Sequence, residues 1–499
     1  MLPPSKNRLV IVSNRLPVVF EEDENGRLQL RPGSGGLVTA LAPVLRNRGG
    51  LWIGWPGTAD TDGVQVEKLL EESTKNVGYN FKPVVLSKEE VEGFYYGFAN
   101  EILWPLFHDL QTRCNFDPTY WKAYRNVNRK FAEVIIENIK DEDHIWIHDY
   151  HLMTVAHELR EMGISARIGY FLHIPFPPMD LFINLPWRFQ ILHALLSYDL
   201  VGFQTQRDRR NFVQCVENML EDVRIQGEGQ VLTAQVDHRE VRIGNFPVSI
   251  DYNEFFQKAA TREVEELAFK IRKELTANHI VLGIDRLDYT KGIPERLTAF
   301  RNLLERYPEI RKKVSLIQIV VPSRVNIPKY HDLKSVIEGL VGEINGRFTQ
   351  PGWVPIHYIF RSIDRTELIA YYRAAQIALI TPLKDGMNLV AKEYSACNVD
   401  ESGVLILSEF AGAAAQLKDG ALLVNPYDVE GVADTLFAAM HMDIDRRREK
   451  VKILREAVRS SDIYSWVDSF LEAAFAHDLE DFPPLAEYIP TDRFVELGS

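Results

Sequence analysis

The sequence predicts an α/β protein built from two doubly wound domains. Short apolar runs alternate along the chain with longer helical patterns, as in parallel sheets whose strands are joined by helices. Most of these runs lack polar alternation, which is typical of strands buried on both faces. There are about ten of them, more than one open sheet usually carries, so we expect two sheets. The length of 499 residues agrees with two or three domains of roughly 100–200 residues each.

The expected elements form two series. The strands predicted in the first half are Arg8–Val12, Ile145–Ile147, Ile168–Leu172 and Leu200–Phe203. Those predicted in the second half are Ile280–Ile284, Leu316–Val321, Ile356–Phe360, Ile377–Ile380, Val404–Leu407 and Leu422–Val424. Helical patterns between the strands occupy Tyr120–Asn138, Val264–Thr276, Glu295–Tyr307 and Val429–Met440. This alternation implies parallel sheets with right-handed crossovers.

The boundary between the two series is expected at Arg242–Pro247, where a new set of helix and strand patterns begins. We therefore predict an N-terminal Rossmann-like domain over residues 1–245 and a C-terminal one over residues 246–465. Residues 466–499 form a closing segment. It starts with an amphipathic helix pattern at Trp466–Leu479 and continues into a proline-rich tail.

The composition excludes several classes of protein. With 57 basic and 70 acidic side chains the net charge is −13, which argues against a nucleic-acid or anionic-membrane binder. The three cysteines, Cys114, Cys215 and Cys397, are widely spaced and indicate a reducing compartment. Neither a secretory signal nor an apolar run of ~20 residues is evident, so we expect a cytoplasmic protein. A phosphorylated ligand then needs a local basic cluster.

Polar residues follow the expected strands, at the edge where open α/β sheets bind ligands. In the first half these are Ser13–Arg15, His148–His151 and His173–Pro175. In the second half they are Asp285–Gly292, Pro322–Arg324 and Thr381–Asn388. The simplest arrangement places both edges on a cleft between two facing domains.

A phosphate-binding loop is predicted after the strand Ile280–Ile284. Arg286 and Lys291 offer a planar fork and a point charge, which suit a diphosphate, although a surface pair is the alternative. Gly386–Leu389 resembles a helix N-terminus, whose free N–H groups favour an anion. Glu393, further along this helix, either accepts hydrogen bonds from ribose hydroxyls or is a solvated carboxylate.

Other motifs are less specific. Gly33–Gly36 matches neither GxGxxG nor a Walker motif. The side chains that could be metal ligands are His148, Asp149, His151 and His173. Asp149 and His151, however, are two positions apart near a strand end, where their side chains tend to point in different directions. We therefore expect no metal site. Tyr95 and Trp104 either stack on a sugar ring or pack in the core.

These residues fall within longer motifs that resemble one known family, the trehalose-6-phosphate synthases. These are retaining glycosyltransferases of family 20 with the GT-B fold, which join UDP-glucose to glucose 6-phosphate. The resemblance covers roughly Arg8 to Leu479. Its motifs are SNRLP (13–17), GSGGL (33–37), LWIGWPG (51–57), WIHDYHL (146–152), FLHIPFP (171–177), RLDYTKG (286–292) and DGMNLVAKEY (385–394).

The resemblance implies a role for each matching position. The catalytic residues it implies are Arg286, Lys291, His173 and Asp149. The donor site for UDP-glucose would contain Gly35, Gly36, Arg286, Lys291, Ile363, Asp385, Leu389, Val390, Ala391, Lys392 and Glu393. The acceptor site for glucose 6-phosphate would contain Arg15, Tyr95, Trp104, Asp149 and Arg324. Asp385 and His173 would contact hydroxyls of the donor glucose, and Ile363 would bind uracil through its backbone.

The resemblance also implies the chemistry and its partners. It implies a front-face mechanism with UDP-glucose as co-substrate and neither a metal nor another cofactor. The first domain would bind the acceptor, the second the nucleotide sugar, and the closing segment would pack back on the first. A homo-oligomer, dimer or tetramer, is possible, and a separate trehalose-phosphatase would act downstream. The alternatives are a glucosylglycerol-phosphate synthase, whose acceptor is glycerol 3-phosphate, and a non-catalytic sugar-phosphate sensor.

Overall fold

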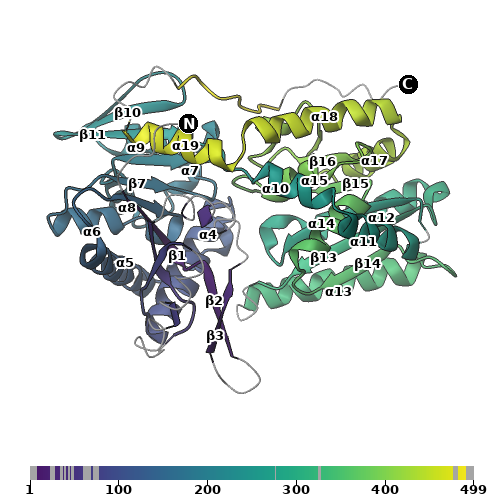
Figure 1. The fold of residues 1–499 in the computed structure, drawn as a ribbon, viewed down its shortest axis with the longest axis horizontal. Coiled ribbons are helices and arrows are strands. Elements are labelled where there is room, and N and C mark those ends of the chain that lie inside the picture. Colours follow the sequence, from purple (N-terminus) through teal and green to yellow (C-terminus); the bar gives the residue numbers. More distant parts are fainter. Residues whose placement is uncertain are drawn as a thin grey trace. The chain divides into compact units, whose positions relative to one another are not determined.

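The structure is a computed structural model in which two compact units are distinguished. It describes residues 8–22, 28–33, 38, 41–42, 45, 50–59, 69–70, 78–275, 277–323, 328–475 and 482–490. Unit 1 comprises Met1–Val248 and Tyr464–Leu485, and unit 2 comprises Ser249–Ile463 and Ala486–Ser499. Each unit has a largely parallel sheet with helices packed around it (Figure 1). The predicted α/β class is therefore confirmed.

Unit 1 contains a nine-stranded sheet of order β5-β4-β1-β6-β7-β8-β11-β10-β9. Neighbouring strands run parallel except in the final β11-β10-β9 meander. The strands are β1 (Leu9–Arg15), β4 (Gly50–Trp55), β5 (Asn80–Pro83), β6 (His144–His148), β7 (Ile168–Phe171), β8 (Leu200–Phe203), β9 (Val223–Gln226), β10 (Val231–Val236) and β11 (Arg239–Asn245). A separate antiparallel pair joins β2 (Val18–Glu22) and β3 (Leu28–Pro32).

The sheet of unit 1 thus contains the four strands predicted in the first half and several that were not predicted. The meander strands were not predicted from the sequence because they are not continuous apolar runs. In β9 half-buried and exposed side chains alternate, β10 contains polar residues among the apolar ones, and β11 contains Arg239, Glu240 and Arg242. The helical elements of this unit are α3 (Lys88–Glu90), η1 (Val91–Leu103), α4 (Trp104–Phe107), η2 (Gln111–Arg113), α5 (Pro118–Asn138), η3 (Tyr150–Leu152), α6 (Val155–Glu161), α7 (Met179–Phe182), α8 (Arg188–Leu195) and α9 (Gln206–Met219).

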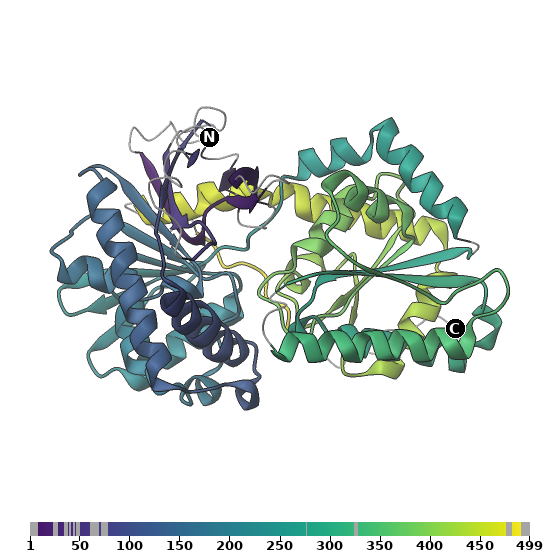
Figure 2. The same cartoon turned by 90° about the horizontal axis from the view of Figure 1, so that it is seen from below.

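Unit 2 contains a six-stranded, wholly parallel sheet of order β14-β13-β12-β15-β16-β17. This is the 3-2-1-4-5-6 order of doubly wound nucleotide-binding folds. Its strands match the six predicted in the second half: β12 (His279–Arg286), β13 (Val314–Val321), β14 (Ile356–Phe360), β15 (Ile377–Ile380), β16 (Val404–Ser408) and β17 (Leu422–Val424). Figure 2 shows helices on both faces of this sheet.

The helices of unit 2 include α11, α12 and α17, which overlap the three helices predicted in this half of the chain. They are α10 (Tyr252–Ala259), α11 (Arg262–Glu274), η4 (Tyr289–Lys291), α12 (Ile293–Arg306), η5 (Pro308–Ile310), α13 (Pro328–Phe348), α14 (Arg365–Ala374), α15 (Leu389–Cys397), α16 (Ala414–Leu417), α17 (Val429–His441) and α18 (Ile444–Ser460).

Helix α19 (Ile463–Phe475) packs on the sheet of unit 1 because two glycines make room for it. A Cβ atom on Gly169 would lie 2.9 Å from the ring of Phe470, and one on Gly202 would lie 2.8 Å from the same ring. Phe470 in turn stacks on Trp146, with ring centroids 4.3 Å apart. Glycines on β7 and β8 therefore set the position of this helix.

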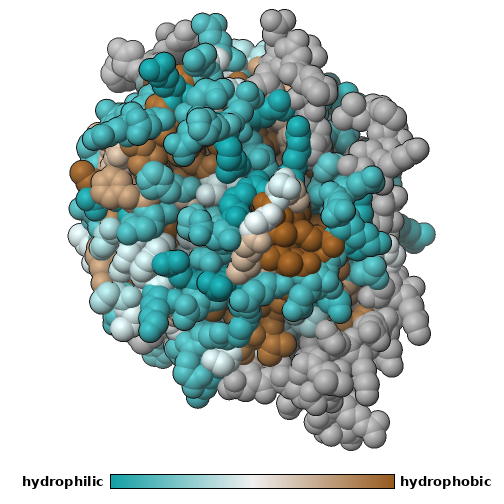
Figure 3. Space-filling model, turned by 90° about the vertical axis from the view of Figure 1, so that its left-hand side faces the viewer, coloured by the Kyte–Doolittle hydropathy of each residue, from teal (hydrophilic) through white to brown (hydrophobic). Residues whose placement is uncertain are grey.

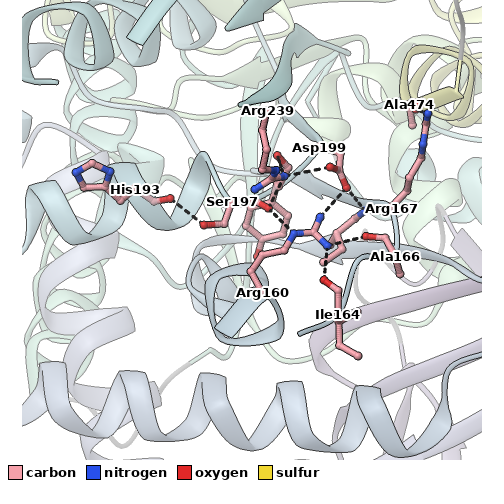
Figure 4. Close-up of polar contacts among 11 residues, drawn as sticks. Arg160, Ile164, Ala166, Arg167, His193, Ser197, Asp199, Arg239 and Ala474 are labelled. Atoms are coloured by element: carbon pink, nitrogen blue, oxygen red, sulfur yellow. Dashed lines mark hydrogen bonds and ion pairs between the residues drawn. The ribbon is translucent and has the colours of Figure 1, made fainter. Parts of the chain in front are cut away.

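The C-terminal carbonyls of α19 are bound by arginines at the amino end of the strands. Arg167 donates to the carbonyl of Ala474 at 3.0 Å and Arg242 to that of Ala473 at 2.6 Å, which offsets the negative end of the helix dipole. In the adjoining network of Figure 4, the Asp199 carboxylate accepts from Arg160 at 2.8 Å and from Arg239 at 3.1 Å. The contacts at the amino ends of these strands therefore stabilise the fold, and the candidate site lies at their carboxyl ends.

The tail after α19 is shared between the two units. The N–H of Gln230 in unit 1 donates to the carbonyl of Phe482 at 2.9 Å. Tyr488 belongs to unit 2, where its hydroxyl donates to Glu409 at 3.3 Å.

The described part of the chain contains no helix that is both long and apolar enough to cross a membrane. The face seen in Figure 3 is mainly hydrophilic, with several hydrophobic areas between the polar residues. Within the described ranges, no three His, Cys, Asp or Glu side chains gather in a way that could hold a metal ion.

Candidate active site

The loop after β12 carries the two predicted diphosphate ligands. Arg286 is the last residue of β12 and is exposed, and Lys291 ends the short helix η4. Asp288 shapes the turn between them by accepting from the N–H of Thr290 at 3.0 Å. Gly292 follows with φ +63°, and a Cβ there would lie 2.3 Å from the carbonyl oxygen of Thr381. Only glycine fits this turn, which holds Lys291 at the carboxyl edge of the sheet.

Lys291 forms an ion pair with another predicted site residue, Asp385. Its Nζ lies 2.6 Å from Oδ2 of Asp385, and each side chain is 14% exposed. The amide of Asn388 donates to the same carboxylate oxygen at 3.1 Å. This contact joins the loop after β12 to the N-terminus of α15, so the predicted cation and the predicted helix end are neighbours.

The N-terminus of α15 is shaped by Asn388, which has a left-handed backbone with φ +80°. Its side-chain oxygen accepts from the N–H of Ala391 at 3.1 Å. The N–H groups of Leu389 and Val390 lie in the first turn of the helix, where backbone donors are not used within the helix. The sequence prediction of a helix starting at Leu389 is confirmed.

Glu393 and Lys392 sit further along α15. The hydroxyl of Tyr372, on α14, donates to Oε2 of Glu393 at 2.7 Å. Burial raises the pKa of Glu393, while the bond from Tyr372 opposes this rise. Lys392 is buried, and burial lowers its pKa to about 7. Ile363 lies half-buried in the loop between β14 and α14.

A buried guanidinium, not identified from the sequence, supports this half of the site. Arg296 on α12 is 1% exposed. It donates to Asp285 at 2.5 Å, to Thr381 at 3.1 Å and to the carbonyl of Lys291 at 3.3 Å. Burial raises the pKa of Asp285 against the opposing effect of Arg296. The sequence offered one signal for this role, which is that Arg296 lies on the apolar face of the predicted helix Glu295–Tyr307.

In unit 1, Arg15 ends β1 against aromatic rings. Its guanidinium carbon lies 4.0 Å from the ring centroid of Trp55 and 5.5 Å from that of Tyr95. A Cβ on Gly57 would clash with this guanidinium, so the glycine makes room for it. Stacking leaves the planar N–H groups of Arg15 available at their edges.

Tyr95 and Trp104 come from an unusual helix. Residues Val91–Leu103 are π-helical, a geometry that is rare and frequent at functional sites. Tyr95 is half-buried and stacks on His151 at 5.9 Å, whereas Trp104 is buried 5.7 Å from Tyr150. Trp104 therefore borders the site from the core.

Asp149 has a strained backbone at the end of β6. Its φ of +77° and ψ of 166° fall in a region used almost only by glycine, at a cost of about 1–3 kcal/mol. The strain places Oδ1 where it accepts from the N–H of His173 at 3.2 Å. Nδ1 of His148 lies 3.1 Å from Nε2 of His173. The structure thus brings Asp149 and His173 together.

Three predicted site residues, Gly35, Gly36 and Arg324, lie outside the described residues. The neighbouring Gly33 is described, and its N–H donates to the carbonyl of Pro17 at 2.8 Å. The functional roles predicted for individual residues stay predictions.

Comparisons with known proteins identify the class. The profile of Glycosyltransferase family 20 matches residues 7–475. A trehalose-6-phosphate synthase of Mycolicibacterium smegmatis is 43% identical over 94% of this chain and 92% of its own. A UDP-forming α,α-trehalose-phosphate synthase of Burkholderia xenovorans in complex with glucose-6-phosphate has a TM-score of 0.84 at 34% identity, covering 94% and 100% of the two chains.

A further solved structure, from E. coli and bound with UDP-2-fluoro glucose, has a TM-score of 0.82 at 36% identity, covering 94% and 99% of the two chains. The two largely parallel α/β folds and the likeness to these structures define a glycosyltransferase of the GT-B class. The chain belongs to glycosyltransferase family 20.

Proposed function

We propose that the protein transfers glucose from UDP-glucose to glucose 6-phosphate and releases UDP and α,α-trehalose 6-phosphate. The observation that carries this proposal is the Lys291–Asp385 ion pair at 2.6 Å, which joins the loop after β12 to the N-terminus of α15. It places a cation beside a helix N-terminus, a combination suited to a diphosphate. The names of the relatives support the same substrates.

Unit 2 supplies the donor site in this proposal. Arg286, Lys291 and the first N–H groups of α15 bind the diphosphate, and Gly35 and Gly36 are further proposed donor-binding residues. Glu393, held by Tyr372 at 2.7 Å, accepts from the ribose hydroxyls. Uracil meets the backbone at Ile363, and the remaining contacts come from Leu389, Val390, Ala391 and Lys392.

Unit 1 supplies the acceptor site. Arg15, stacked over Trp55, binds the phosphate of glucose 6-phosphate together with Tyr95 and Arg324. Asp149 accepts from hydroxyls of the acceptor sugar, and Trp104 forms the wall behind it. We assign the acceptor domain to residues 1–245, the nucleotide-sugar domain to 246–465, and the closing segment to 466–499.

The chemistry follows from where charge develops. Breaking the bond between glucose C1 and the phosphate oxygen leaves negative charge on UDP, which Arg286, Lys291 and the α15 N-terminus stabilise. The acceptor hydroxyl attacks C1 from the same face, which retains the configuration, and its proton passes to the departing phosphate. We propose that the reaction needs neither a metal ion nor a carboxylate nucleophile. His173 and Asp385 orient the donor glucose.

The test is a matrix of UDP-, ADP- and GDP-glucose against glucose 6-phosphate and glycerol 3-phosphate, scored by nucleotide release and by product. We expect UDP-glucose with glucose 6-phosphate to be the preferred pair and a chelator to leave the rate unchanged. Preference for glycerol 3-phosphate would indicate a glucosylglycerol-phosphate synthase, and binding without turnover would indicate a sensor.

We further propose that the enzyme works in the cytoplasm and that a separate trehalose-phosphatase removes the phosphate of its product. The described parts of both units are accounted for by one transfer reaction, and the product still carries a phosphomonoester. A homo-oligomer, dimer or tetramer, is the expected assembly, and light scattering on the eluting protein measures it.

A further inference from the structure

His148, which the sequence placed among possible metal ligands, is paired with a predicted catalytic residue. It is the last residue of β6 and is 0% exposed. Its Nδ1 lies 3.1 Å from Nε2 of His173, just beyond β7. Burial lowers the pKa of His148 well below its ordinary value and that of His173 to about 3. Both rings are therefore neutral at working pH, and the contact holds one hydrogen.

The surroundings of His148 decide which ring donates. Its other nitrogen, Nε2, is buried and has no hydrogen-bond partner in the described part of the chain. If His148 accepted at Nδ1, its hydrogen would sit on Nε2 as a buried, unpaired donor.

The neighbouring rings make that arrangement unfavourable. Trp146 and Trp466 have ring centroids 4.7 Å and 6.5 Å from that of His148. Each already has a buried indole N–H without a partner among the described residues. An N–H at Nε2 would be a third unpaired donor and would add to the cost of burying unpaired polar groups. An unprotonated Nε2 instead presents a lone pair, whose partial negative charge is complementary to the partial positive charge of the indole N–H groups.

We infer that His148 donates from Nδ1 to Nε2 of His173 and thereby fixes the hydrogen of His173 on its own Nδ1. His148 is then a positioning residue that acts through His173. The inference rests on the proposed function, in which His173 contacts a hydroxyl of the donor glucose, and it specifies that His173 is the hydrogen-bond donor in that contact.

The rest of His173 is held for the same task. Its N–H donates to Asp149 at 3.2 Å, and its carbonyl accepts from Gln204 at 3.4 Å. Its ring lies 4.7 Å from Phe171 and 6.1 Å from Trp466. The side chain is half-buried, and Nδ1 makes no hydrogen bond to a described residue. A fixed N–H at this position suits a sugar oxygen that needs a donor.

The experiment compares two replacements of similar size, His148→Asn and His148→Leu. The asparagine amide keeps a donor near the position of Nδ1, whereas leucine keeps only the packing. We expect His148→Leu to lower kcat/KM for UDP-glucose about tenfold and His148→Asn to remain within about threefold of the parent. The KM for glucose 6-phosphate and the affinity for UDP, which lacks the glucose, should stay within about twofold in both.

Nitrogen-15 NMR of histidine-labelled protein provides a readout that needs no substrate. We expect the His173 signals to show hydrogen on Nδ1, assigned by the signals that change in His148→Asn. Hydrogen on Nε2 of His173 would overturn the inference, and so would equal losses in the two variants. Failure of the parent protein to transfer glucose would refute the proposed function instead, and the NMR result would stand apart from it.

Discussion

The replacement Lys291→Ala tests the leaving-group assignment. Lys291 Nζ is 2.6 Å from Asp385, and both side chains are 14% exposed, so the site is largely screened from water. A charge-assisted hydrogen bond contributes about 1.5–3 kcal/mol, and a factor of ten in rate corresponds to about 1.36 kcal/mol. Because the charge on UDP develops in the transition state, loss of this cation should lower kcat by about one to two orders of magnitude.

The assay is steady-state UDP release at saturating UDP-glucose and glucose 6-phosphate. The matched control is Lys258→Ala, which removes a half-buried lysine from a 2.8 Å surface ion pair with the exposed Glu263 in the same unit. We expect the control to keep full activity, since exposed pairs contribute little. Thermal unfolding of both variants should stay close to that of the parent. Near-normal kcat in a folded Lys291→Ala protein would refute the assignment of Lys291 to the leaving group.

Three further outcomes are expected. In Tyr372→Phe the pKa of Glu393 rises further, because burial already raises it and the lost hydrogen bond opposed that rise. Since the ionised carboxylate accepts from ribose, the KM for UDP-glucose should increase as pH falls, beginning at a higher pH than in the parent. Arg15→Ala should raise the KM for glucose 6-phosphate about tenfold or more and leave that for UDP-glucose nearly unchanged. Gly202→Ala should destabilise unit 1 by about 1–3 kcal/mol, measured by denaturant unfolding, because its Cβ would lie 2.8 Å from Phe470.

Each of these outcomes has a control or a contrary result. If the KM for UDP-glucose had the same pH profile in Tyr372→Phe and in the parent, the assignment of Glu393 to the ribose hydroxyls would be wrong. If Arg15→Ala changed only the KM for UDP-glucose, Arg15 would belong to the donor site, and our assignment of the two substrate sites would be reversed. Gly339→Ala on α13, where an added Cβ has nothing within 4 Å, is the packing control for Gly202→Ala and should be neutral or slightly stabilising.

The predictable part of the fold is the part in which neighbouring residues carry the information. The four central strands of unit 2, β12, β13, β15 and β16, are mainly apolar and almost entirely buried, so composition along a few residues is enough to predict them. The β9–β11 meander was missed because polar or charged residues interrupt the apolar residues in each of its strands. The π-helix Val91–Leu103 was missed altogether, since the sequence analysis predicts no helix over these residues.

The candidate site likewise has a part that local sequence predicts and a part that it does not. Arg286, Lys291 and the start of α15 follow from strand ends and a helix start, which local sequence marks. The partners that hold the site do not follow from it: Arg296 reaches Asp285, Thr381 and the carbonyl of Lys291 from a separate helix. Which buried arginine finds which acceptors depends on the packing of helix on sheet.

The sequence by itself determined the α/β class, the two series of strands, the residue types at the strand ends and the resemblance to one family of glycosyltransferases. These follow from local periodicity and from motifs of consecutive residues. Only the tertiary structure decided that Lys291 pairs with Asp385, that Tyr372 holds Glu393 and that His148 faces His173. Such contacts join residues 21 to 94 positions apart in the chain. Local sequence patterns do not show which distant residues will form hydrogen bonds with each other, because that depends on how the helices and strands pack.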